Sequence, residues 1–156
     1  MLAAVLKLVH VLAAMLFFGA GIGSVYYKVR SYQGGVIAVM AFCDREIVRA
    51  DWLFTVPSGV ILPLTGLGLV HVYHLPLTTP WILTGLAGWA IAGITWLPAA
   101  FLQIRMRRLS EEAQASGGTL GPDYHRAQRT WLLLGFPSFC AALLTIWVMV
   151  SKTTPF

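Results

Sequence analysis

The distribution of charged residues constrains this chain more than any other feature of its sequence. Its 156 residues include 11 Lys or Arg and 6 Asp or Glu, yet 53 consecutive residues, 52–104, carry no charge. Shorter charge-free runs cover residues 8–27 and 130–151. About 20 apolar residues are enough for a helix to cross the hydrocarbon core of a bilayer. The long run therefore holds two crossings and each shorter run holds one, which predicts an all-α integral membrane four-helix bundle.

The charge-free runs also divide the chain into spans and connections within a single domain. The predicted spans are 2–27, 52–73, 81–102 and 131–150. In the first connection, residues 33–51 predict an additional helical segment at the membrane interface, with Asp51 capping the start of the second span. The polar, glycine-containing stretch Ser110–Gly121 is expected to be a flexible loop.

Basic residues predict the orientation of the bundle, because membrane proteins concentrate Lys and Arg in their cytoplasmic loops. The turn His74–Pro80 contains none, whereas the other two connections hold nine: Lys28, Arg30, Arg45, Arg49, Arg105, Arg107, Arg108, Arg126 and Arg129. These two connections are therefore expected in the cytoplasm and both termini on the outer side. The same topology explains the net charge of +5, so we expect the lipid bilayer as the main partner and no nucleic acid.

Small residues indicate where helices approach one another closely. Gly19 and Gly23 form a GxxxG pattern in the first span, and Gly88 and Ala92 repeat the spacing in the third. Such faces pack either inside one bundle or between two copies of the chain. We expect the bundle to cover both, although a homo-oligomer or a membrane protein partner remains open.

Four ionisable residues in or near the spans are candidates for function, because ionisable groups are costly inside a membrane. Lys7 and His10 share one face of the first span, and His71 and His74 end the second span on the same side. A neutral imidazole binds transition metals and haem iron. His10 is therefore a candidate haem or metal ligand with His71 or His74 as the second ligand, and Lys7 is positioned to meet a propionate. The simpler alternatives are a hydrogen-bonded structural His10, interfacial His71 and His74, and a Lys7 that reaches the headgroups.

A second group of polar residues lies near the cytoplasmic ends of the later spans. Its members are Arg49, Asp51, Gln103, Arg105, Tyr124, His125 and Arg129. They could form an ion-paired collar, a proton-entry site or a docking surface for a partner protein. The chain has no motif typical of hydrolases or nucleotide-driven pumps.

Four stretches resemble a widespread bacterial family of small integral membrane proteins, the domain of unknown function twenty-two sixty-nine. They read LKLVHVLAAMLFFGAGIG, ADWLFTVPSGVILPLTGLGL, TWLPAAFLQIRMRRL and YHRAQRTWLLLGFPSF. This resemblance implies a location in the bacterial inner membrane and no particular activity. The LKxxH opening also looks like the first span of HemJ-type haem-binding membrane proteins and of CopD-type copper-resistance proteins. In the HemJ type this histidine is a haem b ligand, which maps onto His10.

Two functions from different classes follow from these observations. In the first, the protein binds haem b near the outer leaflet through His10 and has a redox-related role. In the second, it is a non-catalytic scaffold or accessory subunit whose cytoplasmic collar docks a partner protein. The sequence favours the first narrowly, and whether the protein is an enzyme stays open.

Overall fold

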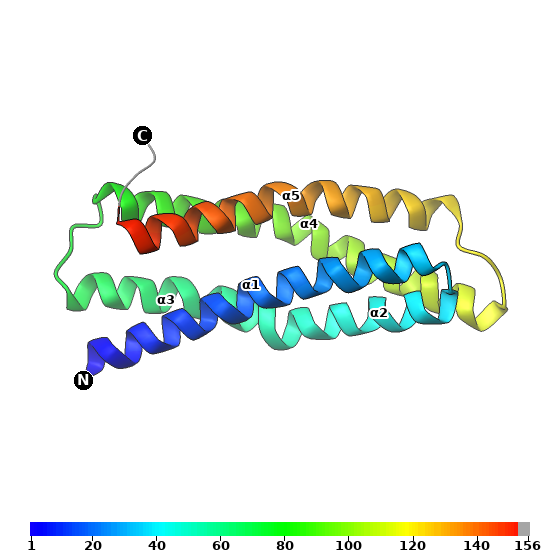
Figure 1. The fold of residues 1–156 in the computed structure, drawn as a ribbon, viewed down its shortest axis with the longest axis horizontal. Helices are drawn as coiled ribbons and strands as arrows, with labels where there is room; N and C mark the ends of the chain where they lie inside the picture. Colours follow the sequence, from blue (N-terminus) through cyan, green and yellow to red (C-terminus); the bar gives the residue numbers. More distant parts are fainter. Residues whose placement is uncertain (153–156) are drawn as a thin grey trace.

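The computed structural model describes residues 1–152, which fold into helices arranged along one common axis (Figure 1). Four helical segments run back and forth: α1 (Leu2–Gly34); α2 (Ile37–Ala50), which continues through the π-helical turn η1 (Asp51–Thr55) into α3 (Val56–Val72); α4 (Pro80–Ser116); and α5 (Pro122–Ser151). Each segment is long and apolar enough to cross a membrane. The predicted fold class is confirmed, including the additional helix α2 in the first connection.

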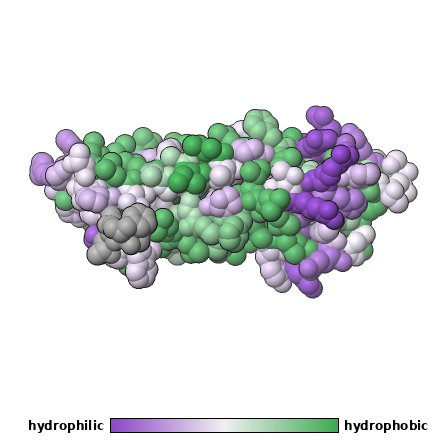
Figure 2. Space-filling model, turned by 90° about the horizontal axis from the view of Figure 1, so that it is seen from above, coloured by the Kyte–Doolittle hydropathy of each residue, from purple (hydrophilic) through white to green (hydrophobic). Residues whose placement is uncertain are grey.

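The two ends of the bundle differ in character. The turn between α1 and α2 and the loop between α4 and α5 lie together at one end, which we call the polar end (Figure 1). In the view of Figure 2, the most hydrophilic residues gather at this end, and hydrophobic side chains cover the middle of the molecule. Gly35 (φ 69°) and Gly117 (φ 63°) end α1 and α4 there, in left-handed conformations that favour glycine.

The helices extend further toward the polar end than the predicted spans do. The expectation of a flexible loop at Ser110–Gly121 was wrong for its first half, because α4 remains helical to Ser116. Its polar composition conceals a buried helical face, formed by Gln103, Met106, Ser110 and Ala113 at three- and four-residue spacing. Only 117–121 form the connection to α5.

The main core of the molecule lies in its polar half. It consists of buried Met40, Ala99, Met106, Tyr124, Ala127 and Trp131. Helix α2 packs mainly on α4 and also on α1. The helix predicted at the interface therefore forms part of the bundle itself and leads directly into the second span.

The apolar half is built from two helix pairs, α1 with α3 and α4 with α5. The face at Gly88 and Ala92 packs on α5 as predicted, since a Cβ at Gly88 would overlap the Thr145 Oγ1 atom. The expectation that the bundle covers Gly19 and Gly23 was wrong, because a Cβ on either would meet nothing within 4 Å. In the α1–α3 pair, the small residues at the contact belong to α3 instead of α1. Its glycines receive side chains of α1, for example Gly59 that of Phe17.

One hydrogen bond ties the two pairs together at a proline. Pro63 has no N–H to donate to the carbonyl of Gly59 four residues earlier, so that carbonyl loses its helical partner. The indole Nε1 of Trp89 in α4 donates to it over 3.0 Å. The bundle thereby satisfies a backbone group that would otherwise be costly in an apolar environment.

Candidate functional site

The second spanning segment contains a π-helical turn where its charged part meets its apolar part. In this turn the Val56 N–H bonds to the Asp51 carbonyl, five residues back, instead of four. Pro57 lies just beyond and cannot donate to Leu53, so the regular hydrogen-bond ladder is already interrupted there. Single π-turns inside α-helices occur frequently at functional sites. Asp51, predicted as a helix cap, therefore lies inside a continuous helix.

Asp51 is a buried acid, and one of its two carboxyl oxygens lacks a well-formed hydrogen bond. Its side chain is 7% exposed, and its Oδ1 accepts a hydrogen bond from the Thr55 hydroxyl at 2.8 Å. Its Oδ2 is buried and has no hydrogen-bond partner in the part of the chain that the structure describes. The Gln103 amide of α4 comes close enough to the same carboxyl to interact with it, but it forms no hydrogen bond of good geometry with Oδ2. A buried carboxylate oxygen without a partner is costly, which makes this atom the strongest indication of a ligand in the molecule.

Asp51 lies in the wall of a cavity between α1, η1, α4 and α5. The cavity has a volume of about 110 Å³. Its aromatic walls are Phe17, Phe18, Trp96, Trp131 and Phe139, and its polar atoms come from Ser24, Thr55, Thr95, Gln103 and Ser138. Among the described residues that line it, Asp51 is the only ionisable one. The arrangement combines one carboxylate with an apolar, aromatic surround, as small-molecule sites commonly do.

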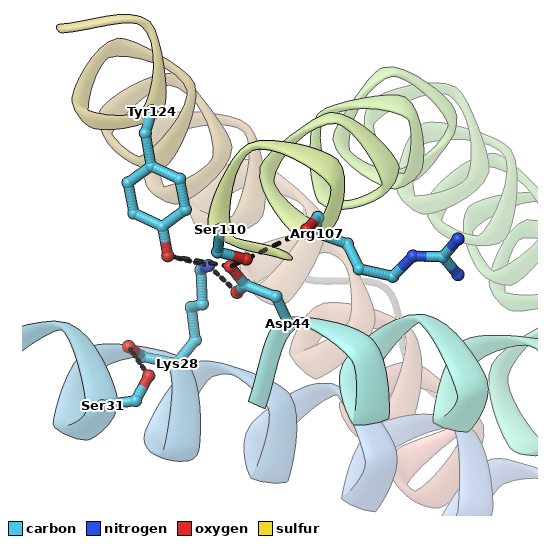
Figure 3. Close-up of polar contacts among 6 residues, drawn as sticks. All are labelled: Lys28, Ser31, Asp44, Arg107, Ser110 and Tyr124. Carbon is cyan, nitrogen blue, oxygen red and sulfur yellow. Dashed lines mark hydrogen bonds and ion pairs between the residues drawn. The ribbon is translucent and has the colours of Figure 1, made fainter. Parts of the chain in front are cut away.

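A second polar cluster, the Lys28 network, joins all four helical segments at the polar end (Figure 3). Lys28 of α1 forms an ion pair with Asp44 of α2 and donates a hydrogen bond to the Tyr124 hydroxyl of α5 at 2.9 Å. Tyr124 and Ser110 of α4 each donate to Asp44 Oδ2 at 2.9 Å. All four residues are at most 3% exposed. Lys28, counted with the cytoplasmic basic residues by its position in the sequence, is an interior residue.

The predicted collar divides among several separate contacts. Asp51 and Gln103 face the cavity, and Tyr124 belongs to the Lys28 network. The other members lie in more exposed positions: His125 contacts Tyr32 at 2.8 Å, Arg105 pairs with Asp123 at 3.1 Å, and Arg49 pairs with Glu46 at 2.7 Å. Arg129 is exposed. The residues therefore do not form one ion-paired ring.

His10 is held by a hydrogen bond between α1 and α3. Its Nδ1 lies 2.9 Å from the Thr65 hydroxyl, which itself donates to the Ile61 carbonyl at 2.7 Å. The hydroxyl proton is thereby used, so Thr65 accepts from Nδ1–H. In the tautomer with its proton on Nδ1 the lone pair lies on Nε2, and the Leu62 carbonyl is a backbone acceptor beside the ring. The ring also packs against Gly66, where an added Cβ would lie 3.3 Å from Cε1.

The other predicted ligands lie apart from this pair. His71 and His74 are exposed, with ring centroids 6.5 Å from each other, and Lys7 is exposed as well. Within residues 1–152, neither His71 nor His74 forms a hydrogen bond or ring contact with His10. The same residues contain no group of three or more His, Cys, Asp or Glu placed to hold a metal ion. The described residues thus offer one oriented imidazole, His10, and no second ligand in contact with it.

Comparison with known protein families gives a match over nearly the whole chain. The sequence model of the family described as "Predicted integral membrane protein (DUF2269)" matches residues 4–153, nearly the whole chain. No curated protein and no solved structure matches it significantly. The sequence resemblance to the integral membrane family is confirmed.

Proposed function

Since the chain belongs to the family of predicted integral membrane proteins DUF2269, we propose that it works inside the bilayer as a binding protein for a small organic cation. The cation would occupy the cavity between α1, η1, α4 and α5. The observation that carries this proposal is the buried Oδ2 of Asp51, which has no well-formed hydrogen bond among the described residues and only the Gln103 amide beside its carboxyl. A positive charge or a strong hydrogen-bond donor satisfies such an atom.

The walls and the size of the cavity define the class of cation. Trp96 and Trp131 offer aromatic faces, which attract alkylammonium groups through cation–π interactions. A cavity of about 110 Å³ is smaller than the roughly 150 Å³ that holds a benzene molecule. The ligand is therefore a compact alkylammonium ion, or the ammonium end of a longer amphiphile.

Titration of the purified protein with methylammonium chloride tests the proposal, because this ion is smaller than benzene and its N–H groups can donate to Asp51. We expect saturable binding by calorimetry and a change in tryptophan fluorescence. Asp51→Asn should weaken binding at least about tenfold, because a charge-assisted contact contributes about 1.5–3 kcal/mol. Methanol, similar in size to methylammonium but uncharged, should bind more weakly than the cation.

Asp123→Asn is the matched control, because it removes the same charge from an exposed carboxyl at the polar end. This variant should keep the affinity of the wild type. Equal affinities of the wild type and Asp51→Asn would overturn the proposal, as would a lack of saturable binding.

A second candidate function is haem b binding at His10. The contact that favours it is the Nδ1 hydrogen bond to Thr65, which orients the ring and, in the tautomer with its proton on Nδ1, leaves the Nε2 lone pair for iron. Haem would supply redox chemistry, and Thr65 would hold the His10 tautomer. Lys7, His71 and His74 lie toward the same end of the bundle and are the candidates for a propionate contact and a second ligand.

Absorption spectroscopy after expression with ample haem decides this second candidate. We expect a Soret band that His10→Ala abolishes and His125→Ala, at the polar end, leaves unchanged. A colourless wild-type protein would exclude haem binding. If neither haem nor the ammonium ion binds, the accessory-subunit function, with a partner docked at the polar end, becomes the leading proposal.

We further propose that the polar end faces the cytoplasm of a bacterial inner membrane, with both termini on the outer side. The support is the concentration of Arg residues at this end. Thr119→Cys at the polar end and Thr78→Cys in the α3–α4 turn are exposed reporters, best placed in a background without Cys43 and Cys140. Labelling of Thr119→Cys by an impermeant reagent added outside intact cells would contradict this orientation.

A further inference from the structure

The Lys28 network and the Asp51 cavity are linked by a repeated pattern of buried polar residues. Each helical segment contributes one residue to the network and a second polar residue one or two turns deeper in the bundle. The four pairs, each buried, are Lys28 and Ser24 of α1, Asp44 and Asp51 of α2–η1, Ser110 and Gln103 of α4, and Tyr124 and Gln128 of α5. Three of the four deeper residues, Ser24, Asp51 and Gln103, line the cavity. The fourth, Gln128, is not part of its wall.

Gln128 occupies the level between the network and the cavity. It lies one turn from Tyr124, which belongs to the network, and one turn from Trp131, which lines the cavity. Residues at such spacing share one face of a helix. The Gln128 side chain is 2% exposed, and both its Oε1 and its Nε2 are buried without a partner among the described residues. Buried amides of this kind are satisfied by water in folded proteins.

We propose that these residues form a hydrated path from the polar end to Asp51, through which protons enter and leave its carboxyl. Water bound to Gln128 would connect the hydroxyl of Tyr124 with the Asp51 side of the cavity. A proton would leave the Asp51 carboxyl to this water and pass to the solution at the polar end. The charged groups beside the path are Lys28 and Asp44, which neutralise each other as an ion pair.

The hydrated path rests on the proposed function in one respect, which is that Asp51 is the residue that binds the ligand. It predicts that the site communicates with the aqueous phase at the polar end and not with the lipid alone. A cation arriving at Asp51 could therefore displace a proton to that side. The test below uses no ligand, so its outcome is independent of whether methylammonium binds.

Cysteine accessibility tests the hydration of the path. In a background of Cys43→Ala and Cys140→Ala, we compare Gln128→Cys with its neighbour Ala127→Cys. Both positions are almost fully buried, at 2% and 4% exposure, but Ala127 belongs to the apolar core cluster. A small charged methanethiosulfonate reagent added at the polar end should modify Gln128→Cys at least about tenfold faster, because thiols in apolar surroundings are unreactive. Equal rates at both positions would overturn the proposal.

Infrared spectroscopy tests the proton exchange itself. At acidic pH, where Asp51 is protonated, its C=O stretch is identified as the band that Asp51→Asn removes. On transfer to D₂O this band should shift at least about tenfold more slowly in Gln128→Leu than in the wild type, since leucine cannot hold water in the path. Gln128→Glu, which keeps a polar group, should exchange rapidly again. An unchanged exchange rate in a folded Gln128→Leu variant would overturn the path.

Discussion

In the polar half of the bundle, one buried ion pair with its hydrogen bonds joins all four helical segments, whereas in the apolar half the helices associate two by two. Lys28 and Asp44 hold the first region together. In the second region, α5 packs closely at Gly88 within one pair, and the two pairs are joined by the indole hydrogen bond of Trp89 and the stacked rings of Phe18 and Phe139. The difference follows from the surroundings. Where water surrounds the helices, burial of apolar side chains drives their association into a common core. Between apolar helices in lipid this driving force is absent, so association depends on close packing and interhelical hydrogen bonds.

The largest expected effect comes from breaking the ion pair. Asp44→Asn leaves the Lys28 ammonium buried without its counter-charge, which should lower the free energy of unfolding by about 3–5 kcal/mol. Glu46→Gln, which breaks the more exposed pair with Arg49, should cost less than about 1 kcal/mol. Denaturation in detergent micelles, followed by circular dichroism, compares the two. Similar losses in both variants would show that the polar half does not depend on a buried pair.

A smaller effect is expected where the α4–α5 pair depends on close fit. In Gly88→Ala the new Cβ overlaps Thr145 Oγ1 and lies 3.3 Å from the Ala141 carbonyl oxygen, so either the Thr145 side chain must rotate away from its hydrogen bond to Ala141 or α5 must move. We expect a loss of about 1–3 kcal/mol in the same unfolding measurement. Gly19→Ala is the matched control, because its Cβ meets nothing within 4 Å and alanine favours the helix by up to about 1 kcal/mol. Destabilisation by Gly19→Ala would mean that its face is covered by a second molecule.

The smallest effect is expected at the link between the two pairs. Trp89→Phe removes the donor to the Gly59 carbonyl and should cost about 1 kcal/mol. Pro63→Ala restores a backbone N–H to that carbonyl, so the double variant should be more stable than Trp89→Phe alone. The coupling between the two substitutions, measured as a double-mutant cycle, is the quantity to determine. Strict additivity would show that the indole does not replace the missing helical bond.

The four spanning helices could be predicted from the sequence because charge is excluded from lipid-facing segments. Their extension at the polar end could not be predicted from composition, since the charged residues there look like those of a solvated loop. Lys28 and Asp44 are 16 residues apart, and nothing local distinguishes a buried pair from two exposed residues. The spacing of Gln103, Met106 and Ser110 is typical of one face of a helix, but the polar residues around them obscured this pattern.

The candidate site was predictable only in part. Asp51 and Gln103 were both identified as polar residues near helix ends, but their common cavity depends on how α1 and α5 pack around them. The contact of His10 with Thr65 joins positions 55 residues apart, which a single sequence does not reveal. Pro57 is visible in the sequence and disturbs a helix, but it does not specify a π-turn. The unpartnered amide of Gln128 is a property of its surroundings and has no signature in the chain.

The π-turn also sets the rotational phase between the two halves of the second segment. It contains one residue more than a regular α-helical turn, and each residue of an α-helix advances the chain by about 100° around the axis. Deleting one residue from Asp51–Thr55 would convert the turn to α-helix without breaking the segment. A deletion within α2 or α3 would instead rotate one half against the other by that angle. The π-turn at Asp51 therefore divides the segment into two parts along one unbroken helix. The extra residue in the turn fixes how far the buried face of α2 is rotated relative to that of α3.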